Sequence, residues 1–293
     1  MKINNPLVSV LMTAYNRELY IAEAIESVLA QDYENFELII VDDCSSDNTL
    51  EIAKSYQKND SRIHIYENEK NLGDYPNRNR AASYAIGKYL KYLDADDVLY
   101  PNSINIMVVA MEKHPEAALG IQSNKIQLDK TYPILLDSPT AIRNHYLGGG
   151  VLLPGPSGVI LKKTVFDKIG GFSGKRFVGD TECWIKIACL YDILILSPSI
   201  VWWREHDDQE IKKEAKDFEP VFIRYQIDQQ YFNDPNFPLS REERSLIKNK
   251  SNRRFLLNIF KLLVIKFKFR SAIKYSLRSK MGFSQLLKTI FYK

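Results

Sequence analysis

Short apolar runs alternate with helical patterns along the first 115 residues of the chain. Buried strands are predicted at Leu7–Met12, Phe36–Val41, Arg62–Tyr66 and Lys88–Leu93. Between and after them, apolar residues recur every three or four positions, which predicts helices at Glu18–Gln31, Asp47–Gln57, Arg78–Ile86 and Ser103–His114. Strands that alternate with helices of this length indicate βαβ units, and therefore an α/β domain with a mostly parallel sheet flanked by helices.

The chain from about Gly148 onward is less regular. Clusters of glycine and proline at Gly148–Gly150 and Pro154–Gly158 predict loops. The remaining expected elements are helices at Thr164–Ile169 and Asp180–Leu190, a strand at Ile193–Val201, a helix at Glu219–Tyr231 and a helical segment from Arg241 onward. This order favours a globular domain followed by a helical tail.

The formal net charge of +4 conceals two oppositely charged regions. Residues 241–293 contain 15 of the 40 Lys and Arg residues but only two of the 36 acidic residues, Glu242 and Glu243. Their net charge is therefore +13, and residues 1–240 carry −9. A basic tail on an acidic body predicts a charged partner for the tail, either a membrane or a nucleic acid.

The tail mixes its basic residues with large apolar ones. One helix face can hold Leu256, Phe260, Leu263 and Phe267, while the basic side chains lie largely elsewhere on the helix. This composition is typical of a helix at the surface of an anionic membrane. The alternatives are a helix packed on the body and nucleic-acid binding, for which the sequence contains no motif. We therefore expect peripheral membrane contact through residues 241–293 and no nucleic-acid partner.

Cysteine usage and the chain start bear on the compartment. The three cysteines are an odd number without CxxC spacing, which predicts a reducing compartment and no structural zinc. The polar start and the brevity of the first apolar run do not match a signal peptide, and the apolar part of the tail is too interrupted by charge to span a membrane. We expect a cytoplasmic protein that is peripheral at the cytoplasmic face of a membrane.

Acidic residues directly follow two of the predicted strands. Asp94-Ala95-Asp96-Asp97 comes after Lys88–Leu93, and Asp42-Asp43 comes after Phe36–Val41. Parallel sheets bind ligands at the carboxyl ends of their strands. Carboxylates at this edge can ligate Mg²⁺ or Mn²⁺ together with a substrate phosphate, and can accept hydrogen bonds from a base or ribose. The alternatives are a solvated turn for the first group and an N-cap or Asx turn for the second.

A third polar segment, Thr13-Ala14-Tyr15-Asn16-Arg17, follows the first strand, and the Tyr15 ring can stack on a nucleobase there. Taken together, these motifs resemble the family 2 glycosyltransferases of the GT-A fold. The resemblance runs from Val8–Arg17 (VSVLMTAYNR) through Ile25–Thr49 to Gly87–Pro101 (GKYLKYLDADDVLYP), and more weakly to about His206. No GxGxxG motif supports a dinucleotide-binding Rossmann fold instead.

The resemblance implies that the chain moves a sugar from a nucleotide-sugar, expected to be UDP-linked, to an acceptor hydroxyl with inversion. The residues that would contact the nucleotide-sugar are Thr13, Ala14, Tyr15, Arg17, Asp43, Arg78, Asp94 and Asp96. Tyr15 would stack on uracil, Asp43 would bond the base, and Asp94 would face the ribose. Asn79 completes an Arg-Asn pair near the nucleotide. A divalent metal, Mn²⁺ or Mg²⁺, would bridge the diphosphate and be held by Asp96, Asp97 and His206.

A later acidic segment, Gly179–Trp184, resembles the Glu-Asp pair with which the family opens a helix. Gly179 stands where the Glu is usual, so Asp180 is the residue that matches. Inverting transfer requires a carboxylate to take the proton from the acceptor hydroxyl, and Asp180 is the predicted base, with Glu182 as fallback. A helix N-cap is the alternative role for Asp180. The glycine also leaves open a nucleotide-binding protein without transferase activity.

The second half of the domain would complete the site. Arg204 would neutralise phosphate charge, Pro154–Gly158 would approach the sugar or acceptor, and three tryptophans (Trp184, Trp202 and Trp203) would either stack on a sugar or pack in the core. We expect a GT-A domain at 1–240, with a nucleotide-binding part at about 1–115 and an acceptor part at about 116–240, and a basic helical tail at 241–293. The acceptor would be a glycan or a lipid-linked glycan of the cell surface.

Overall fold

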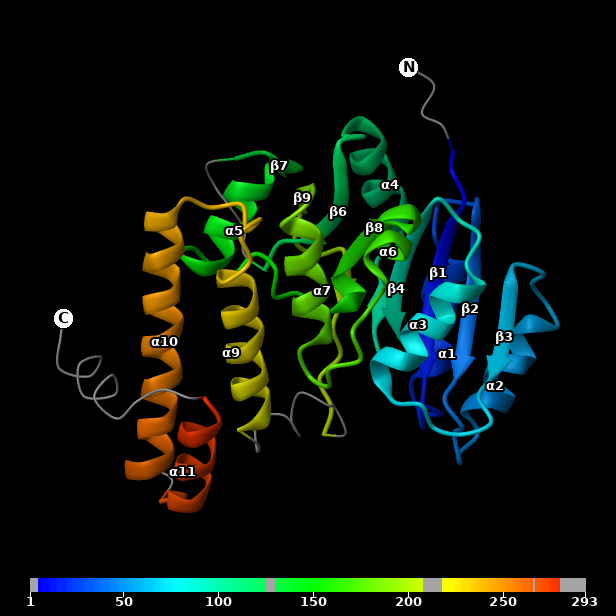
Figure 1. The fold of residues 1–293 in the computed structure, drawn as a ribbon. Coiled ribbons are helices and arrows are strands. Elements are labelled where there is room, and N and C mark those ends of the chain that lie inside the picture. The colour runs from blue at the N-terminus through cyan, green and yellow to red at the C-terminus, as the bar shows by residue number, and fades with distance from the viewer. Residues whose placement is uncertain (1–4, 125–129, 208–217, 266, 280–293) are drawn as a thin grey trace. The chain divides into compact units, whose positions relative to one another are not determined.

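The computed structural model describes residues 5–124, 130–207, 218–265 and 267–279 (Figure 1). The chain divides into two units, Met1–Asp207 and Asp208–Lys293. This division lies earlier than the expected boundary at residue 240. The reason is that helix α9 (Glu219–Phe232) packs in one apolar cluster with α10 (Arg241–Val264).

The first unit is built on an eight-stranded sheet of order β3-β2-β1-β4-β8-β6-β9-β7. Its strands are β1 (Val8–Ala14), β2 (Phe36–Asp42), β3 (Ile63–Glu67), β4 (Tyr89–Asp94), β6 (Ala117–Gln122), β7 (Ile134–Leu136), β8 (Val159–Lys162) and β9 (Asp192–Leu196). Neighbours from β3 to β4 are parallel, β8 is antiparallel to both β4 and β6, and β9 is parallel to β6 and antiparallel to β7. The mostly parallel sheet is therefore confirmed.

Helices lie on both faces of this sheet (Figure 1). They are α1 (Ile21–Leu29), α2 (Thr49–Gln57), α3 (Asp74–Tyr84), α4 (Ser103–Lys113), α5 (Ser138–Tyr146), α6 (Lys163–Ile169) and α7 (Gly179–Ala188). Alternate residues of β1, namely Val8, Val10 and Met12, pack with α1 and α4, and Leu11 is buried as well. Burial on both sides explains why β1 reads as a continuous apolar run rather than an alternating one.

The predicted strand at Ile193–Val201 is wrong as a single element. The chain forms β9 up to Leu196, bends, and then forms β10 (Val201–Trp202), which pairs antiparallel with β5 (Val98–Leu99) in a separate two-stranded sheet. Pro198 lies in the bend and cannot donate a ladder hydrogen bond, and Ser199 has a φ of 66°. This bend brings the segment after β10 beside the end of β4.

The helix expected at Arg78–Ile86 begins earlier and ends earlier, at Asp74–Tyr84. The strands β6 and β8 and the helix α5 were not predicted from the sequence. Strand β6 was hard to predict because its sequence, AALGIQ, holds one β-branched residue and no aromatic residue. Asp137 caps α5 because its side chain accepts a hydrogen bond from the backbone N–H of Thr140 at 2.8 Å.

The second unit contains α9, α10 and α11 (Phe269–Arg278). A capping box starts α10: Ser240 accepts from the N–H of Glu243, and Glu243 accepts from the N–H of Ser240. The three helices share a core formed by Phe222, Tyr225, Phe255, Ile259, Leu262, Ala272 and Tyr275. None of the helices that the structure describes is long and apolar enough to cross a membrane.

The expected helix face of the tail is corrected by this packing. Of its four residues only Leu256 is buried, whereas Phe260 is 44% exposed. Phe267 lies beyond α10, which ends at Val264. The chain reverses there, because Phe267 has a φ of 49° and the N–H of Lys268 bonds the carbonyl of Leu262 at 2.8 Å. Residues 266 and 280–293 of the expected tail lie outside the described residues.

Candidate functional site

The carboxyl ends of three parallel strands meet at one edge of the sheet. Thr13 of β1 lies opposite Asp94 of β4, and Ala14 lies opposite Asp42 of β2. The segments that follow these strands are therefore neighbours, as the sequence predicted. Ala14 is 2% exposed, and its carbonyl accepts from the N–H of Asp43 at 2.8 Å, so Ala14 contributes scaffold at this edge.

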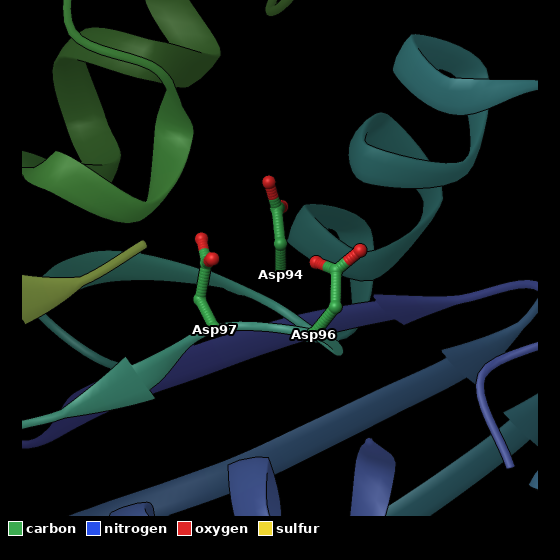
Figure 2. A group of neighbouring side chains, drawn as sticks. All are labelled: Asp94, Asp96 and Asp97. Carbon is green, nitrogen blue, oxygen red and sulfur yellow. The ribbon is translucent and has the colours of Figure 1, made fainter. Parts of the chain in front are cut away.

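Three aspartates at the end of β4 and in the turn that follows it form one cluster (Figure 2). Asp94, Asp96 and Asp97 each offer a carboxylate oxygen, and these oxygens lie within 4.8 Å of one another. A turn holds them together, in which the N–H of Asp97 donates to the carbonyl of Asp94 at 3.0 Å. Burial, with the nearby charge of Asp94, raises the pKa of Asp97 to about 7. A divalent cation would offset the repulsion among these carboxylates, and an all-oxygen donor set suits Mg²⁺ or Mn²⁺.

Asp96 is also contacted by two cationic or ionisable side chains. The Nε of Arg17 and the Nε2 of His206 each lie 2.9 Å from Asp96 Oδ2. The side chain of His206 is 8% exposed, and its ring lies 4.7 Å from that of Tyr20. The structure thus brings His206 to the acidic cluster across 110 residues of chain. Both contacts use one oxygen of Asp96, so a metal ion would approach the other oxygen or displace one of these partners.

Arg204 hydrogen-bonds the turn that contains Asp96 and Asp97, here called the acidic turn. Its backbone N–H donates to Asp97 Oδ1 at 3.2 Å, and its Nε donates to the carbonyl of Asp96 at 3.0 Å. Its guanidinium also bonds Glu23 at 2.5 Å. These contacts make Arg204 a residue that positions the aspartates, and its expected contact with phosphate stays a prediction.

Arg78 is buried beneath the cluster and links it to α3. Its guanidinium lies 2.7 Å from Asp74 and 2.7 Å from Asp94. Burial alone would lower the pKa of Arg78, but the two carboxylates outweigh burial and raise the pKa above its ordinary value. Arg78 therefore stays charged and fixes the orientation of Asp94.

Asp43 anchors the loop that precedes α3. Its carboxylate accepts from Asn68 Nδ2 at 2.7 Å, from the N–H of Leu72 at 2.8 Å and from the N–H of Gly73 at 2.9 Å. A carboxylate has about four lone-pair positions, so three bonds leave capacity for one more donor such as a base N–H. The bonds also make Asp43 a structural residue whether or not a base is bound.

Tyr15 is the most accessible of the predicted nucleotide contacts at the end of β1, with 47% of its surface exposed. The next residue, Asn16, has a φ of 52° and ties this turn to the one after β2. Its N–H donates to Ser45 Oγ at 2.9 Å, and its side chain accepts from the N–H of Ser46 at 2.8 Å. The backbone around Tyr15 is thereby fixed while its ring stays open to a ligand.

Asp180 lies in the first turn of α7, beside Tyr75 of α3. Burial, followed by the charges of Asp180 and Asp74, raises the pKa of Tyr75. A Cβ atom at Gly179 would lie 2.8 Å from the Tyr75 ring, which is why this position holds glycine. Tyr75 and Arg78 share α3 and the partner Asp74, so α3 connects Asp180 to the acidic cluster.

Two residues that the sequence associated with the site have structural partners instead. Glu182, the fallback base, is 7% exposed and bonds Ser173 and the ammonium of Lys175. Asn79 bonds the backbone N–H and carbonyl of Phe172 at 2.9 and 2.8 Å. Both side chains secure the turn before α7 and leave Asp180 as the carboxylate of this segment that faces Tyr75.

The loop Pro154–Gly158 is bound to the acidic cluster, and its expected approach to the sugar or acceptor stays a prediction. Ser157, in the 3₁₀ turn η1 (Pro156–Gly158), accepts from the N–H of Asp94 at 2.9 Å and hydrogen-bonds the Asp97 side chain. The fully buried Lys91 donates to the carbonyls of Ser157 and Tyr92. Burial lowers the pKa of Lys91 to about 7.

Sequence reasoning missed both Lys91 and Ser157. A lysine inside the apolar strand β4 (YLKYLD) was the available signal, since an unpaired ammonium is rarely buried.

The tryptophans divide into two groups. Trp184 is fully buried and donates to the carbonyl of Pro154 at 3.0 Å, so it belongs to the core. Trp202 and Trp203 are 43% and 39% exposed. They border a cavity of about 450 Å³ whose lining residues are Tyr20, Trp202, Trp203, Arg204, Glu205 and His206. This cavity adjoins the acidic cluster through His206 and has aromatic walls suited to a sugar ring.

Comparison with known proteins places these features in context. The family model described as Glycosyl transferase family 2 matches residues 9–170. An Escherichia coli protein named UDP-Glc:alpha-D-GlcNAc-diphosphoundecaprenol beta-1,3-glucosyltransferase WfgD is 42% identical over 108 residues, which are 37% of this chain and 42% of WfgD. For three bacterial relatives at 42–47% identity, the match spans 36–42% of their own length.

Two solved structures resemble the whole fold. One is S. aureus TarS in complex with UDP-GlcNAc, with a TM-score of 0.71, 19% identity, and coverage of 96% of this chain and 81% of that chain. The other is the mannosyltransferase PcManGT from Pyrobaculum calidifontis with GDP-Man and Mn²⁺, with a TM-score of 0.65, 16% identity, and coverage of 96% and 78%. These similarities show that the fold is shared.

Proposed function

This chain belongs to glycosyl transferase family 2, and we propose that it transfers a sugar from a nucleotide-sugar to an acceptor hydroxyl. The observation that carries the proposal is the cluster of Asp94, Asp96 and Asp97 at the carboxyl ends of the parallel strands. The GT-A fold expected from the sequence agrees with the structural neighbours. A diphosphate leaving group is strongly anionic, and this edge of the sheet offers carboxylates for a cation together with Arg17.

The donor proposed is a UDP-sugar. TarS was solved with UDP-GlcNAc, and the name of WfgD specifies UDP-Glc, whereas PcManGT was solved with GDP-Man. In this chain the exposed Tyr15 ring would stack on uracil, and the remaining acceptor capacity of Asp43 would take a base N–H. Thr13, opposite Asp94 in the sheet, would line the same pocket.

The cofactor proposed is Mn²⁺ or Mg²⁺, held by Asp96, Asp97 and His206. Such an ion stabilises the negative charge that develops on the diphosphate as the sugar–phosphate bond breaks. The chain's own part is to orient the ligands: Arg204 positions the turn, and Arg78 positions Asp94 for the ribose. Arg17, which pairs with Asp96, would turn toward the phosphates when donor binds.

Asp180 is proposed as the catalytic base for inverting transfer. Its carboxylate would take the proton of the acceptor hydroxyl while that oxygen attacks the anomeric carbon, and the nucleoside diphosphate would leave with the bonding electrons. The alternative role as N-cap is wrong, because Val178 is the cap residue of α7 and no side chain caps this helix. Asp180 is the second residue of α7, and its carboxylate accepts a hydrogen bond from the backbone N–H of Thr181 at 2.6 Å.

The acceptor proposed is a glycan, either free or lipid-linked, in the assembly of a cell-surface polysaccharide or glycolipid. WfgD is named for a diphosphoundecaprenol-linked acceptor, which supports the lipid-linked form. A lipid-linked acceptor would place the protein at the cytoplasmic face of the membrane. Peripheral contact through residues 241–293 would suit this location, because that segment carries a net charge of +13.

A two-step measurement tests this function. Thermal stability is compared across nucleotide-sugars with Mn²⁺ or Mg²⁺, since a ligand at 100 times its Kd stabilises by about 2.7 kcal/mol. The stabilising donor is then assayed for hydrolysis and for transfer to polysaccharide and lipid-linked acceptors. Metal-dependent binding followed by turnover supports the proposal.

The second candidate function is nucleotide binding without transfer, which the glycine at position 179 favours. Wild-type protein that binds UDP with Mn²⁺ but turns over no donor in any acceptor screen would support this candidate over the first.

A further inference from the structure

Helix α11 exposes an apolar stripe. Phe269, Ile273 and Leu277 are spaced four residues apart and therefore lie along one face of the helix. They are 56%, 58% and 75% exposed. The opposite side of α11 is buried, where Ala272 and Tyr275 pack into the core of the second unit. Large apolar side chains thus point away from the core at three successive turns, while other residues of the same helix fill the core.

The stripe continues into the turn before α11. Phe267 is 73% exposed, and its ring centroid lies 6.5 Å from that of Phe269. Val264 and Ile265, at the end of α10, are 50% and 66% exposed. We call Phe267, Phe269, Ile273 and Leu277 the apolar stripe. Exposed apolar surface that is contiguous in this way marks a contact site.

Basic residues flank the apolar stripe without acidic neighbours in sequence. Lys268, Arg270 and Lys274 are all exposed, and no acidic residue follows Glu243 in the chain. Arg278 differs, because it pairs with Glu219 at 2.9 Å and stacks over Phe222. The stripe is therefore bordered by three positive charges that face solvent.

We propose that the apolar stripe docks on an anionic lipid surface, with α11 lying in the plane of the membrane interface and its flanking cations on lipid phosphates. The inference rests on the proposed membrane contact of the tail and assigns that contact to particular side chains. Anionic headgroups complement the flanking charges, whereas a second copy of the chain would bring like charges together. An amphipathic helix with lysine and arginine beside phenylalanine and leucine has the composition of an interfacial helix.

Vesicle flotation with the full chain tests the proposal. Vesicles of phosphatidylcholine alone are compared with vesicles that also contain phosphatidylglycerol, in wild type and two variants. One variant removes the stripe (F269S/I273S/L277S), and the other reverses its charges (K268E/R270E/K274E). Wild type is expected to float with the anionic vesicles only. Each variant is expected to bind at least about tenfold more weakly. The first loses the burial of three large apolar side chains, and the second replaces three attractive charges with repulsive ones.

Matched controls use exposed residues of the first unit. They are I86S/L190S for the apolar variant and K58E/K70E/K130E for the charge variant, and both should bind anionic vesicles like wild type. The proposal would be overturned if wild type did not bind anionic vesicles, or if the stripe variants bound them as well as wild type does. A lipid-free wild-type dimer that becomes monomeric in the stripe variant would also overturn it, because the stripe would then join two copies.

UDP binding with Mn²⁺ is measured on the same preparations. The stripe variants should retain it, since their residues lie in the second unit. Loss of vesicle binding with retained UDP binding supports the surface alone. Failure of wild type to bind UDP would contradict the proposed function. The vesicle result would still decide, on its own, whether the apolar stripe docks on lipid.

Discussion

The half of the sheet formed by β3, β2, β1 and β4 contributes to the site differently from the half formed by β8, β6, β9 and β7. In the first half, parallel strands end side by side, so Thr13, Asp43 and Asp94 reach one edge through backbone topology alone. In the second half the strands are mixed in direction, and the site residues arrive on the segments that connect or follow these strands. Ser157 and His206 then contact the acidic cluster through side chains.

This difference suggests a division of labour. The parallel half supplies the charges that a metal and a nucleotide need, and the mixed half fixes where those charges point. Substitutions in the first half should therefore abolish ligand binding. Substitutions in the second half, apart from the proposed metal ligand His206, should impair transfer or stability while ligand binding persists.

Asp180→Asn should give the largest effect, and it should separate sugar transfer from ligand binding. It removes the proposed base and should lower the rate of transfer about 10²–10⁴-fold, with UDP affinity unchanged. Steady-state kinetics with titration of UDP measures both. Glu182→Gln is the matched control, because Glu182 is engaged by Lys175 and Ser173 and should affect stability more than rate. Equal rate losses in the two variants would contradict the assignment of Asp180.

Lys91→Met breaks the junction between the two halves. It removes the ammonium that bonds the carbonyls of Ser157 and Tyr92, so two buried acceptors lose their donor. The free energy of unfolding should fall by about 1–3 kcal/mol, as measured by urea denaturation. Lys58→Met, at an exposed position, should change it little. A Lys91 variant as stable as wild type would show that the loop Pro154–Gly158 is held by other contacts.

Gly179→Ala tests the contact between α7 and α3. The new Cβ would meet the buried Tyr75 ring at 2.8 Å, and such overpacking typically costs about 1–3 kcal/mol. Gly155→Ala is the control, because no atom lies within 4 Å of a Cβ built there. Thermal melting of both variants measures the difference. Equal melting temperatures for the two variants would show that steric exclusion does not explain the glycine at position 179.

The pH dependence of stability reports on the acidic cluster without metal. The pKa of Asp97 is raised to about 7 in the folded chain, against about 3.9 in unfolded chains. The folded state therefore binds more protons between these values, and the free energy of unfolding should fall as pH rises from about 4 to about 7. In EDTA, melting temperatures of wild type should show this fall relative to Asp97→Asn. A stability difference between the two that does not change with pH would contradict it.

The same contrast decided what the sequence could predict. The strands β1, β2 and β4 are mostly apolar and end in polar motifs, so the elements and the sheet edge that Asp43 and Asp94 share were predictable. Their detailed partners were not, because the bonds of Asp43 to Leu72 and Gly73 join residues about 30 positions apart.

In the mixed half the local signals were weaker. Strands β6 and β8 were missed, and β9 and β10 were joined across Pro198. The bonds of Arg204 to the acidic turn and to Glu23 were not predicted either. Sequence spacing cannot reveal such tertiary contacts, since they depend on how two distant segments pack.

The central claim is that the acidic cluster holds a divalent cation that in turn holds the nucleotide diphosphate. Calorimetric titration of UDP with and without Mn²⁺ tests it most directly, in wild type, in Asp96→Asn and in the control Asp32→Asn, whose side chain is exposed. We expect Mn²⁺ to strengthen UDP binding at least about tenfold in wild type and in the control, and this gain to vanish in Asp96→Asn. UDP affinity that is independent of Mn²⁺, or a gain that survives in Asp96→Asn, would contradict the claim.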